Sequence, residues 1–356
     1  MKDWVDHFKS FYPKMNVIDY TKSKAKIDKG VIVINYDLLW RRTELKTLVD
    51  FTLMLDESSL IQNENAKRTK FILRMNPKNV ILLSGTPTSG KYEKLWSQCR
   101  LLGWNISKRD FYNRYVIEQE LNIKTSPFPI KIVVGYKNVE ELKTMLRKYG
   151  CHFLKTEDVL ELPEQMFVNV NIDVTPQYRK FVKDKVVDVD GKTLLGDTTL
   201  TQMLYERMLC GQYNKNKLDA FADLLDSTED RLIVFYSFNE ELEKLKEIAK
   251  NRPQSEINGS RKDLTAYDEH DNSITFVQYQ AGAMGVNLQK ANKIVYFSLP
   301  LSSDLFEQSK KRTHRIGQSK PCFYYTMVCK NSIEERILKT LKMRQDYTEK
   351  LFLKNV

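Results

Sequence analysis

The stretch Phe51-Thr-Leu-Met-Leu-Asp-Glu-Ser-Ser59 decides the fold. Its apolar part does not alternate with polar residues, which is typical of a strand buried on both faces of a parallel sheet. It ends in two carboxylates, Asp56 and Glu57. Ligands of open α/β sheets bind at the carboxyl ends of the strands. The acid pair is therefore expected where the chemistry of such a fold takes place.

Further apolar, β-branched runs of the same kind occur along the chain. Between many of them lie stretches compatible with helices, such as Glu64 to Met75 and Glu240 to Lys250. This alternation of buried strands and helices predicts an α/β fold with crossover helices. The other predicted strands are Val31 to Ile34, Val80 to Leu83, Leu232 to Phe235, Ile274 to Val277 and Ile294 to Phe297.

The spacing of the strands predicts two domains. With 356 residues the chain is too long for one ordinary core. The strands fall into a group before about Leu102 and a group after about Arg231, and we place the boundary near Pro163. Between the groups we expect a loop, a helix, a hairpin with an Asp-Gly turn and further helices. These segments are Lys124 to Pro129, Val139 to Tyr149, Val186 to Leu195 and Leu200 to Leu225.

The bulk composition indicates a protein that stays in the cytoplasm. No stretch reaches the roughly 20 unbroken apolar residues that cross a bilayer, and the N-terminus lacks the apolar core of a signal peptide. The five cysteines are scattered without metal-ligand spacing, which indicates free thiols in a reducing compartment. The net charge of +11 suits nucleic acid, although any soluble basic protein could carry it.

The acid pair has the residue types needed to hydrolyse a nucleoside triphosphate. Asp56 can hold Mg²⁺ through water, and Glu57 can orient the attacking water. Alone, the pair could equally begin a helix, because acids favour helix N-termini. The next strand, however, runs into Ser84-Gly-Thr-Pro87, whose hydroxyls can relay a hydrogen bond between nucleotide and nucleic acid. Together the two motifs favour the catalytic interpretation over an ordinary turn.

A second motif, Gln308-Ser-Lys-Lys-Arg-Thr-His-Arg-Ile-Gly-Gln318, carries two arginines. We predict a helix here, on which Arg312 and Arg315 are three residues apart and share a face. Two guanidinium groups on one face can grip a γ-phosphate and stabilise the charge that develops during its transfer. The ordinary alternative is a solvated basic helix.

These motifs resemble those of the Swi/Snf-type ATPases of helicase superfamily 2. The acid pair and the segment Leu83 to Pro87 are similar to motifs II and III of that family. Arg312 to Gln318 is similar to its motif VI. Leu232 to Ser237 and Gln280 to Leu288 resemble motifs IV and V.

The resemblance implies two RecA-like lobes, the first of them incomplete, with a helical and hairpin insertion between them. Lys215 to Leu218 resembles the entry into the second lobe, and Asn331 to Leu338 resembles the helix that braces that lobe. Ser59 stands where the family usually has a histidine that couples the two motor sites. The expected parts are a partial first lobe over 1–104, an insertion or linker over 105–165, a second lobe over 166–330 and the brace helix over 331–356.

The resemblance also implies roles, with ATP and Mg²⁺ as cofactors and double-stranded DNA as partner. The expected catalytic residues are Asp56, which would hold Mg²⁺ through water, Glu57, Arg312 and Arg315. The expected ATP-binding residues are Gly285, Gln308, Arg312 and Arg315. Those expected to couple ATP closure to movement are Ser84, Gly85, Thr86, Gly282 and Asn287. Those expected to contact DNA are Tyr36, Ser237 and Gly282.

The sequence contains no phosphate-binding loop of the form Gly-x4-Gly-Lys-Ser/Thr, which such an ATPase needs. Gly85 to Lys91 imitates the loop, but Tyr92 stands where its hydroxyl residue belongs. In the family the loop lies upstream of Trp4. We therefore expect truncation before the loop, or a split gene in which a separate polypeptide supplies it, in preference to a degenerate remnant. A parallel sheet without the strand that carries the loop would expose an apolar edge.

The predicted function is that of a DNA translocase or helicase of this type, which couples ATP hydrolysis to movement and is inactive without the missing loop. One alternative is a non-catalytic DNA-binding or regulatory remnant. Another is a helicase subunit of a restriction system, for which no nuclease motif is visible. The short inserts resemble viral or bacterial members, which predicts the cytoplasm of a bacterium or of a virus-infected host cell. Tyr36, Trp40 and Trp96 could stack on bases, but packing is the simpler interpretation.

Overall fold

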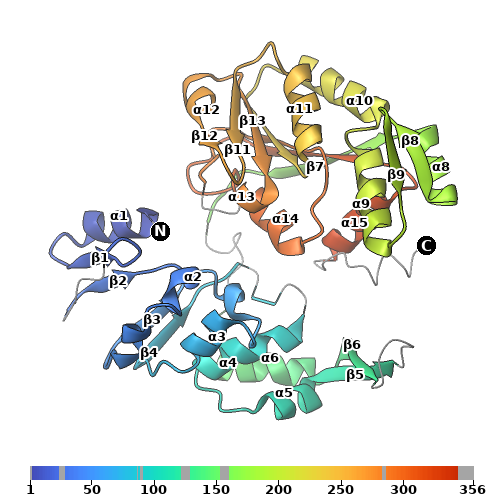
Figure 1. Cartoon of the computed structure of the whole chain (residues 1–356). Coiled ribbons are helices and arrows are strands. Elements are labelled where there is room, and N and C mark those ends of the chain that lie inside the picture. The colour runs from blue at the N-terminus through green and yellow to red at the C-terminus, as the bar shows by residue number, and fades with distance from the viewer. Residues whose placement is uncertain are drawn as a thin grey trace. The chain divides into compact units, whose positions relative to one another are not determined.

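The computed structural model describes residues 2–23, 29–85, 87–88, 91–121, 129–152, 160–282 and 286–343 (Figure 1). The chain divides into two compact units, Met1–Phe153 and Leu154–Val356. Each unit mixes helices with β-strands, which confirms the predicted α/β class. Among the described residues, no helix is long and apolar enough to cross a membrane.

Among the described residues, the first unit has three two-stranded sheets. Strands β1 and β2 are parallel, as are β3 and β4, whereas β5 and β6 are antiparallel. The strands are β1 (Val17–Asp19), β2 (Val31–Val33), β3 (Thr52–Leu55), β4 (Asn79–Leu82), β5 (Val116–Leu121) and β6 (Ile130–Tyr136). The α-helices are α1 (Lys2–Phe11), α2 (Tyr36–Leu39), α3 (Lys67–Ile72), α4 (Trp96–Leu101), α5 (Lys108–Tyr115) and α6 (Val139–Lys148). Short 3₁₀ helices are η1 (Thr43–Thr47), η2 (Ser58–Ile61) and η3 (Tyr92–Leu95).

The parallel pair β3–β4 buries only one of its two faces. Leu55 is buried in the core beneath the pair, together with Ile61 and Ile72. On the other face Met54 lies opposite Ile81 in the register, and their side chains are 38% and 45% exposed. Burial on both faces, as predicted for these strands, is therefore wrong here. Successive side chains of a strand point to opposite faces, and none of the described elements covers the outer one.

The segment after the first four strands packs within the first unit. Trp104, Phe111 and Leu142 form a second core with Cys99 of α4. The predicted helix at Val139 to Tyr149 is confirmed as α6. Strands β5 and β6 were not predicted, and residues 124–128 of the predicted loop lie outside the described residues. The finer division of the chain into four parts stays a prediction.

The second unit is built on one seven-stranded sheet with the order β12-β11-β13-β10-β14-β15-β7. All neighbouring strands are parallel except β12, which runs antiparallel to β11 at one edge. The strands of this sheet are β7 (Gln165–Ile172), β10 (Leu232–Tyr236), β11 (Gln254–Ile257), β12 (Lys262–Asp263), β13 (Ile274–Gln278), β14 (Lys293–Tyr296) and β15 (Cys322–Cys329).

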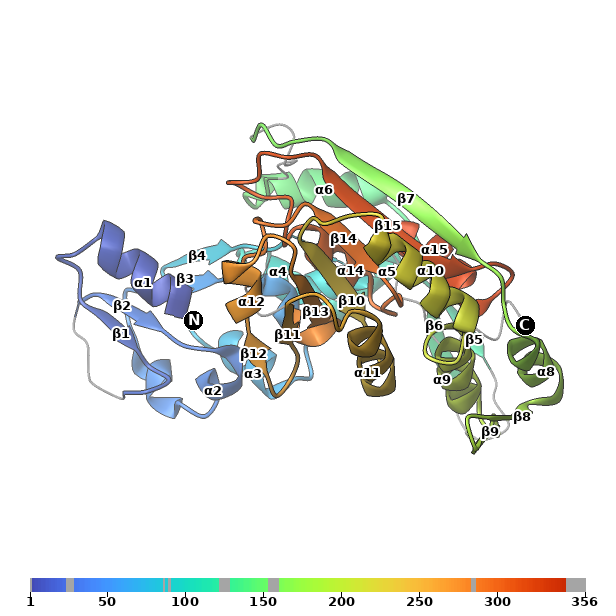
Figure 2. The ribbon, with the colours of Figure 1, turned by 90° about the horizontal axis from the view of Figure 1, so that it is seen from above.

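Helices cover this sheet, and the central strands are buried as predicted. All five residues of β10 are buried, as are four of the five in β13. Helices α10 and α11 lie side by side in both views of the chain (Figures 1 and 2). The helices are α8 (Pro176–Asp184), α9 (Thr199–Cys210), α10 (Lys215–Asp226), α11 (Asn239–Ile248), α12 (Thr265–Glu269), α13 (Tyr279–Gly282), α14 (Ser303–Lys310) and α15 (Ile333–Lys342).

The predicted hairpin is confirmed as β8 (Val186–Val189) and β9 (Lys192–Leu195), which pair antiparallel. Its turn residues, Asp190 and Gly191, have φ angles of 49° and 74°. A two-residue turn with both φ angles positive matches the right-handed twist of the flanking strands, which is why Asp-Gly favours it.

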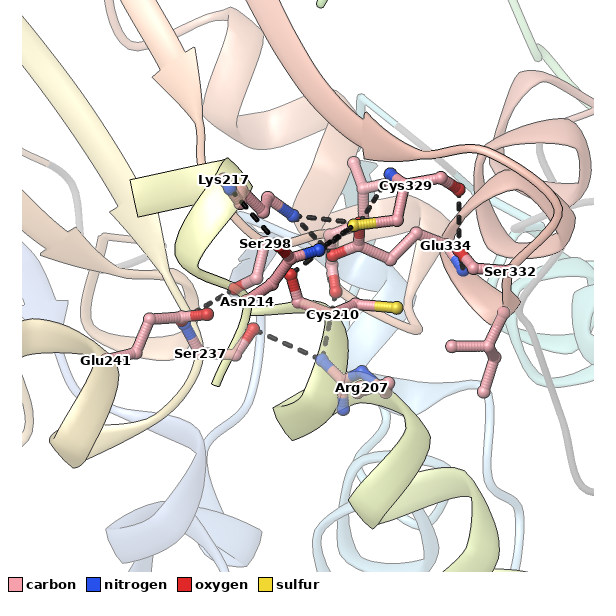
Figure 3. Close-up of polar contacts among 12 residues, drawn as sticks. Arg207, Cys210, Asn214, Lys217, Ser237, Glu241, Ser298, Cys329, Ser332 and Glu334 are labelled. Atoms are coloured by element: carbon pink, nitrogen blue, oxygen red, sulfur yellow. Dashed lines mark hydrogen bonds and ion pairs between the residues drawn. The ribbon is translucent and has the colours of Figure 1, made fainter. Parts of the chain in front are cut away.

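A buried ion pair joins α10 to α15 in the second unit (Figure 3). Lys217 Nζ donates to both carboxylate oxygens of Glu334, at 2.6 and 2.8 Å, and the side chain of Lys217 is fully buried. The backbone N–H of Cys329 donates to the same carboxylate at 3.0 Å. Cys210, Cys329 and Glu334 place three possible metal-ligand atoms within 4.8 Å of one another. The Lys217 ammonium, however, already neutralises the carboxylate, so we assign this cluster to an ion pair rather than to a cation site.

Replacing Lys217 by methionine should destabilise the second unit by about 3–5 kcal/mol, because it leaves the buried Glu334 carboxylate without its counter-charge. Urea unfolding measures the loss. Lys215→Met is the matched control, since Lys215 lies on the same helix but is exposed; it should change stability by less than about 0.5 kcal/mol. Equal effects of the two substitutions would contradict the assignment, and adding Glu334→Leu to Lys217→Met should recover most of the loss.

Candidate active site

The acid pair follows β3 directly, at the carboxyl end of a parallel strand pair. Beyond the strands, Leu83 N–H donates to Leu55 O at 2.9 Å and Ser58 N–H donates to Leu83 O at 2.8 Å. These bonds extend the pairing of β3 with β4 past the acids. The acid pair and the segment that begins at Ser84 therefore lie beside each other, as expected from parallel topology.

Glu57 has a left-handed backbone conformation, with φ 53° and ψ 53°. For a residue with a Cβ this conformation costs roughly 1–2 kcal/mol. The residue precedes η2, but its side chain makes no capping hydrogen bond to that helix. The ordinary alternative, in which the acids begin a helix, is met only by this short 3₁₀ helix, without a side-chain cap. Strained backbone of this kind is concentrated at functional sites, which supports a functional role for Glu57.

Asp56 is held from two directions within the first unit. The indole Nε1–H of Trp4 donates to Asp56 Oδ2 at 2.8 Å. The Tyr36 hydroxyl donates to the backbone carbonyl of Asp56 at 2.7 Å. Burial raises the pKa of Tyr36, and the nearby charges of Asp56 and Glu57 raise it further. The hydroxyl therefore stays protonated and able to donate.

Tyr36 owes its place to the cap of a short helix. Asn35 is the N-cap of α2, and its side-chain oxygen accepts the backbone N–H of Leu38 at 2.8 Å. Tyr36 is the first residue of that helix, and its ring packs against the core below β3. A contact of Tyr36 with DNA stays a prediction, and its hydroxyl is engaged by Asp56.

The residues present fit magnesium. The Asp56 side chain is exposed, and carboxylate oxygens are the donors that Mg²⁺ prefers. Because Mg²⁺ keeps several of its waters, it needs open space beside a carboxylate and not an enclosed cage. When bound, the ion would neutralise charge on the transferring phosphate.

A buried glutamine connects the acid pair to the motif that follows β4. Gln98 of α4 accepts the Ser58 hydroxyl at 3.0 Å and donates to Pro87 O at 2.9 Å. Gln62 donates to the same carbonyl, also at 2.9 Å. The sequence gave no reason to single out Gln98, because its partners lie 40 and 11 positions away. Of the predicted coupling residues here, Ser84 is half-buried, Gly85 is exposed, and Thr86 lies outside the described residues.

In the second unit, predicted residues follow two neighbouring strands. Ser237 comes directly after β10, and α13, which ends at Gly282, comes directly after β13. Ser237 N–H donates to the buried carboxylate of Glu241 at 2.8 Å, and its hydroxyl accepts Arg207 Nη2 at 3.2 Å (Figure 3). Burial raises the pKa of Glu241. The turn after β10 is thus fixed by a polar network among α9, α11 and the sheet.

The arginine motif is not the helix that we predicted. Helix α14 ends at Lys310, and the residues after it form turns. Arg315 Nη1 donates to Asn287 Oδ1, and Leu288 N–H donates to Arg312 O at 3.1 Å. The carbonyl of Arg312 thus accepts a tertiary hydrogen bond in place of a helical one, and the Arg315 side chain contacts the segment after β13. The structure therefore brings Arg315 and Asn287 together. Arg312 and Arg315 do not share the face of a helix, contrary to our prediction, because helix α14 ends before them.

The last residues of the arginine motif make hydrogen bonds that hold its end in place. Gly317 has φ +96°, a conformation that favours glycine. Gln318 Nε2 donates to Gln289 O at 3.1 Å and to Ala291 O at 2.9 Å. His314 Nε2 lies 2.8 Å from the carbonyl oxygen of Pro163, just before β7.

Two further residues were predicted to bind ATP, Gln308 at the start of the arginine motif and Gly285. Gln308 lies half-buried in α14, and Gly285 lies outside the described residues. Trp40 packs against the first core of the first unit, and Trp96 donates its indole N–H to Ile106 O at 3.0 Å. A cavity of about 580 Å³ opens beside Trp96 and the amino end of β4, and the acid pair is not part of its lining.

The chain thus has two α/β units, one with an acid pair after a parallel strand and one with an arginine motif hydrogen-bonded to the segment after β13. Residues 1–218 match the family described as the SNF2-related domain, and residues 216–317 match the helicase conserved C-terminal domain. The chain belongs to the SNF2-related family.

Relatives occur in bacteria and in eukaryotes. The uncharacterized ATP-dependent helicase MG018 of Mycoplasma genitalium is 23% identical over 99% of this chain and 36% of its own length. The ISWI chromatin-remodeling complex ATPase ISW1 of Saccharomyces cerevisiae is 24% identical over 90% of this chain and 31% of its own. The chain thus spans about a third of these relatives. The SWI2/SNF2 ATPase core of Sulfolobus solfataricus in complex with double-stranded DNA covers 100% of this chain and 80% of its own at 20% identity, with a TM-score of 0.40.

Replacing Gln98 by methionine should destabilise the first unit by about 1–3 kcal/mol, because Ser58 Oγ loses its acceptor and Pro87 O loses one donor. Chemical unfolding followed by the fluorescence of the tryptophans, all of which lie in this unit, measures the change. Gln119→Met on the exposed part of β5 is the control and should be nearly neutral. If Gln98→Met is as neutral as the control, the glutamine does not connect the two motifs.

Proposed function

We propose that this chain is the acid and arginine part of a motor that couples ATP hydrolysis to movement along double-stranded DNA. The main support is that the proposed catalytic residues lie at or beside segments that follow parallel strands in both units. Asp56 and Glu57 follow β3 in the first unit, and Arg315 is bonded to the segment after β13 in the second. Ligands of open α/β sheets bind at such strand ends.

Each predicted residue has a role in this proposal. Asp56 would hold the magnesium ion through water, and Glu57 would orient the attacking water. Arg312 and Arg315 stabilise the charge that develops on the γ-phosphate, with Gly285 and Gln308 beside the nucleotide. Residues after β4 and β13 would couple closure of the two units on ATP to movement along DNA. Residues after β2, β10 and β13 would contact DNA. These are Ser84, Gly85, Thr86, Gly282 and Asn287 for coupling, and Tyr36, Ser237 and Gly282 for DNA.

Double-stranded DNA is the proposed partner for two reasons. The chain has a net charge of +11, and cationic proteins gain affinity for DNA by releasing its counterions. The SWI2/SNF2 ATPase core of Sulfolobus solfataricus, to which this chain is similar, was solved in complex with double-stranded DNA. Because the first reason is electrostatic, we expect the affinity of this chain for DNA to fall steeply with rising salt.

We further propose that the phosphate-binding loop comes from residues outside this sequence, on a separate polypeptide or an upstream part of the same one. The sequence contains no Gly-x4-Gly-Lys-Ser/Thr. The uncovered face of β3–β4, with Met54 and Ile81 side by side, supports this proposal. Parallel sheets are normally covered on both faces, so further structure over this face would complete the unit.

Mixing the chain with a polypeptide that carries a Gly-x4-Gly-Lys-Ser/Thr loop and its strand should restore DNA-stimulated ATP hydrolysis. In that assembly Arg315→Ala should lower turnover by about 10³-fold or more, because transition-state arginines of this kind contribute that much. Phosphate release measures turnover, and fluorescence anisotropy with duplex DNA should show binding unchanged. Arg179→Ala, on the exposed side of α8, is the control.

Two results would count against the proposal in different ways. Unchanged turnover in Arg315→Ala would remove the arginine from the catalytic residues. No turnover in the complete wild-type assembly would favour the alternative, a non-catalytic DNA-binding or regulatory module. That alternative is supported by the same missing loop in the sequence.

A further inference from the structure

The hydrogen bond from Trp4 to Asp56 joins two segments 52 residues apart in the chain. The donor is an indole N–H and the acceptor is the carboxylate oxygen Oδ2, 2.8 Å away. An indole can donate one hydrogen bond and accept none, whereas an ionised carboxylate has about four acceptor positions. The bond therefore takes one position on Oδ2 and leaves the others of the carboxylate available.

The indole is held in place by its own helix. Val5, the next residue of α1, is buried at 8% exposure and anchors the helix to the unit. The Trp4 ring stacks on Phe8, with centroids 6.0 Å apart and an interplanar angle of 30°. The edge of the His7 ring meets it at 6.1 Å. These ring contacts favour the orientation of the indole that meets Asp56.

The backbone of Asp56 is fixed as well as its side chain. The Tyr36 hydroxyl binds the carbonyl oxygen of Asp56, and the left-handed Glu57 follows directly. Strand β3 holds the preceding residue, Leu55, in the ladder with β4. With the backbone set, the remaining freedom of Asp56 is rotation of its carboxylate, and the Trp4 bond removes that rotation.

The orientation of a metal-binding carboxylate affects metal affinity and catalytic activity. Groups that hydrogen-bond to a metal ligand fix its direction, and their loss commonly costs 10- to 100-fold in metal affinity or activity. Among the described residues, only Trp4 makes a hydrogen bond to the side chain of Asp56. Asp56 as a whole is exposed, so its other oxygen, Oδ1, remains available to a hydrated cation.

We infer that Trp4 is a positioning residue for Asp56: its indole N–H fixes the carboxylate so that Oδ1 faces the waters of a divalent cation. The cation part of this inference rests on the proposed function. The carboxylate orientation itself rests on the hydrogen bond and on the packing of α1. Trp4 acts through Asp56 and touches neither nucleotide nor metal.

The indole N–H signals of the four tryptophans in ¹⁵N-labelled protein test this inference on the chain by itself. Trp4→Phe assigns the Trp4 signal. Asp56→Asn should shift that signal upfield, because a charged acceptor is replaced by a neutral one. The signal of Trp96, which donates to a backbone carbonyl of the same unit, is the matched control and should not move. A Trp4 signal that stays in place in Asp56→Asn would overturn the inference.

Manganese ion alone, as a paramagnetic substitute for magnesium, tests the cation part. It should broaden the Trp4 indole signal at lower concentrations than the Trp96 signal, and Asp56→Asn should abolish the difference. Equal broadening of the two signals would overturn the positioning role. Neither measurement requires hydrolysis, so an inactive assembly would count against the proposed function and not against the contact.

In the hydrolysing assembly, Trp4→Phe should raise the Mg²⁺ concentration for half-maximal turnover by about 10-fold or more. The DNA concentration for half-maximal stimulation should not change. A merely structural role for Trp4 would disturb both dependences together, and that result would contradict the inference.

Discussion

Parallel pairing of β-strands is the constraint on which the rest of this structure depends. It brings the segments that follow neighbouring strands to one edge of each sheet. In the first unit the ladder of β3 with β4 sets the acid pair beside Ser84. In the second unit the ladder of β10 with β13 sets Ser237 and Gly282 after adjacent strands. Residues far apart in the sequence thus lie at the same edge of a sheet because of strand pairing, and they need no hydrogen bond to each other.

The parallel sheets of the two units differ in their number of strands and in how deeply those strands are buried. Strand β10 lies inside a seven-stranded sheet and is buried throughout. Strands β3 and β4 form a two-stranded sheet whose outer side chains are exposed. Isolated two-stranded sheets are at best marginally stable. The acid pair is therefore carried by the weaker sheet, and Gln98, Tyr36 and Trp4 supply hydrogen bonds that the sheet alone does not.

Much of the fold could be predicted from local patterns, and the remainder depends on contacts that no local pattern carries. Continuous apolar runs predicted β10 and β13, and Asp190-Gly191 predicted a hairpin turn that needs two positive φ angles. Strand β7, with the sequence QMFVNVNI, was missed because it does not form a continuous apolar run. The predicted helix at Arg312 is wrong: the carbonyl of Arg312 accepts the backbone N–H of Leu288, a tertiary bond that no local pattern carries. Pairs such as Lys217 with Glu334, 117 residues apart, leave no trace in one sequence.

We propose that the acid pair stands on a sheet that further structure completes. Amide hydrogen exchange of Thr52–Leu55 and Asn79–Leu82, compared with Leu232–Tyr236, tests it most directly. The account predicts rapid exchange in the first two strands and slow exchange in the third, because local stability follows burial. It also predicts that a polypeptide carrying the phosphate-binding loop slows exchange in the first two. Exchange in β3 and β4 as slow as in β10, in the chain alone, would contradict the account.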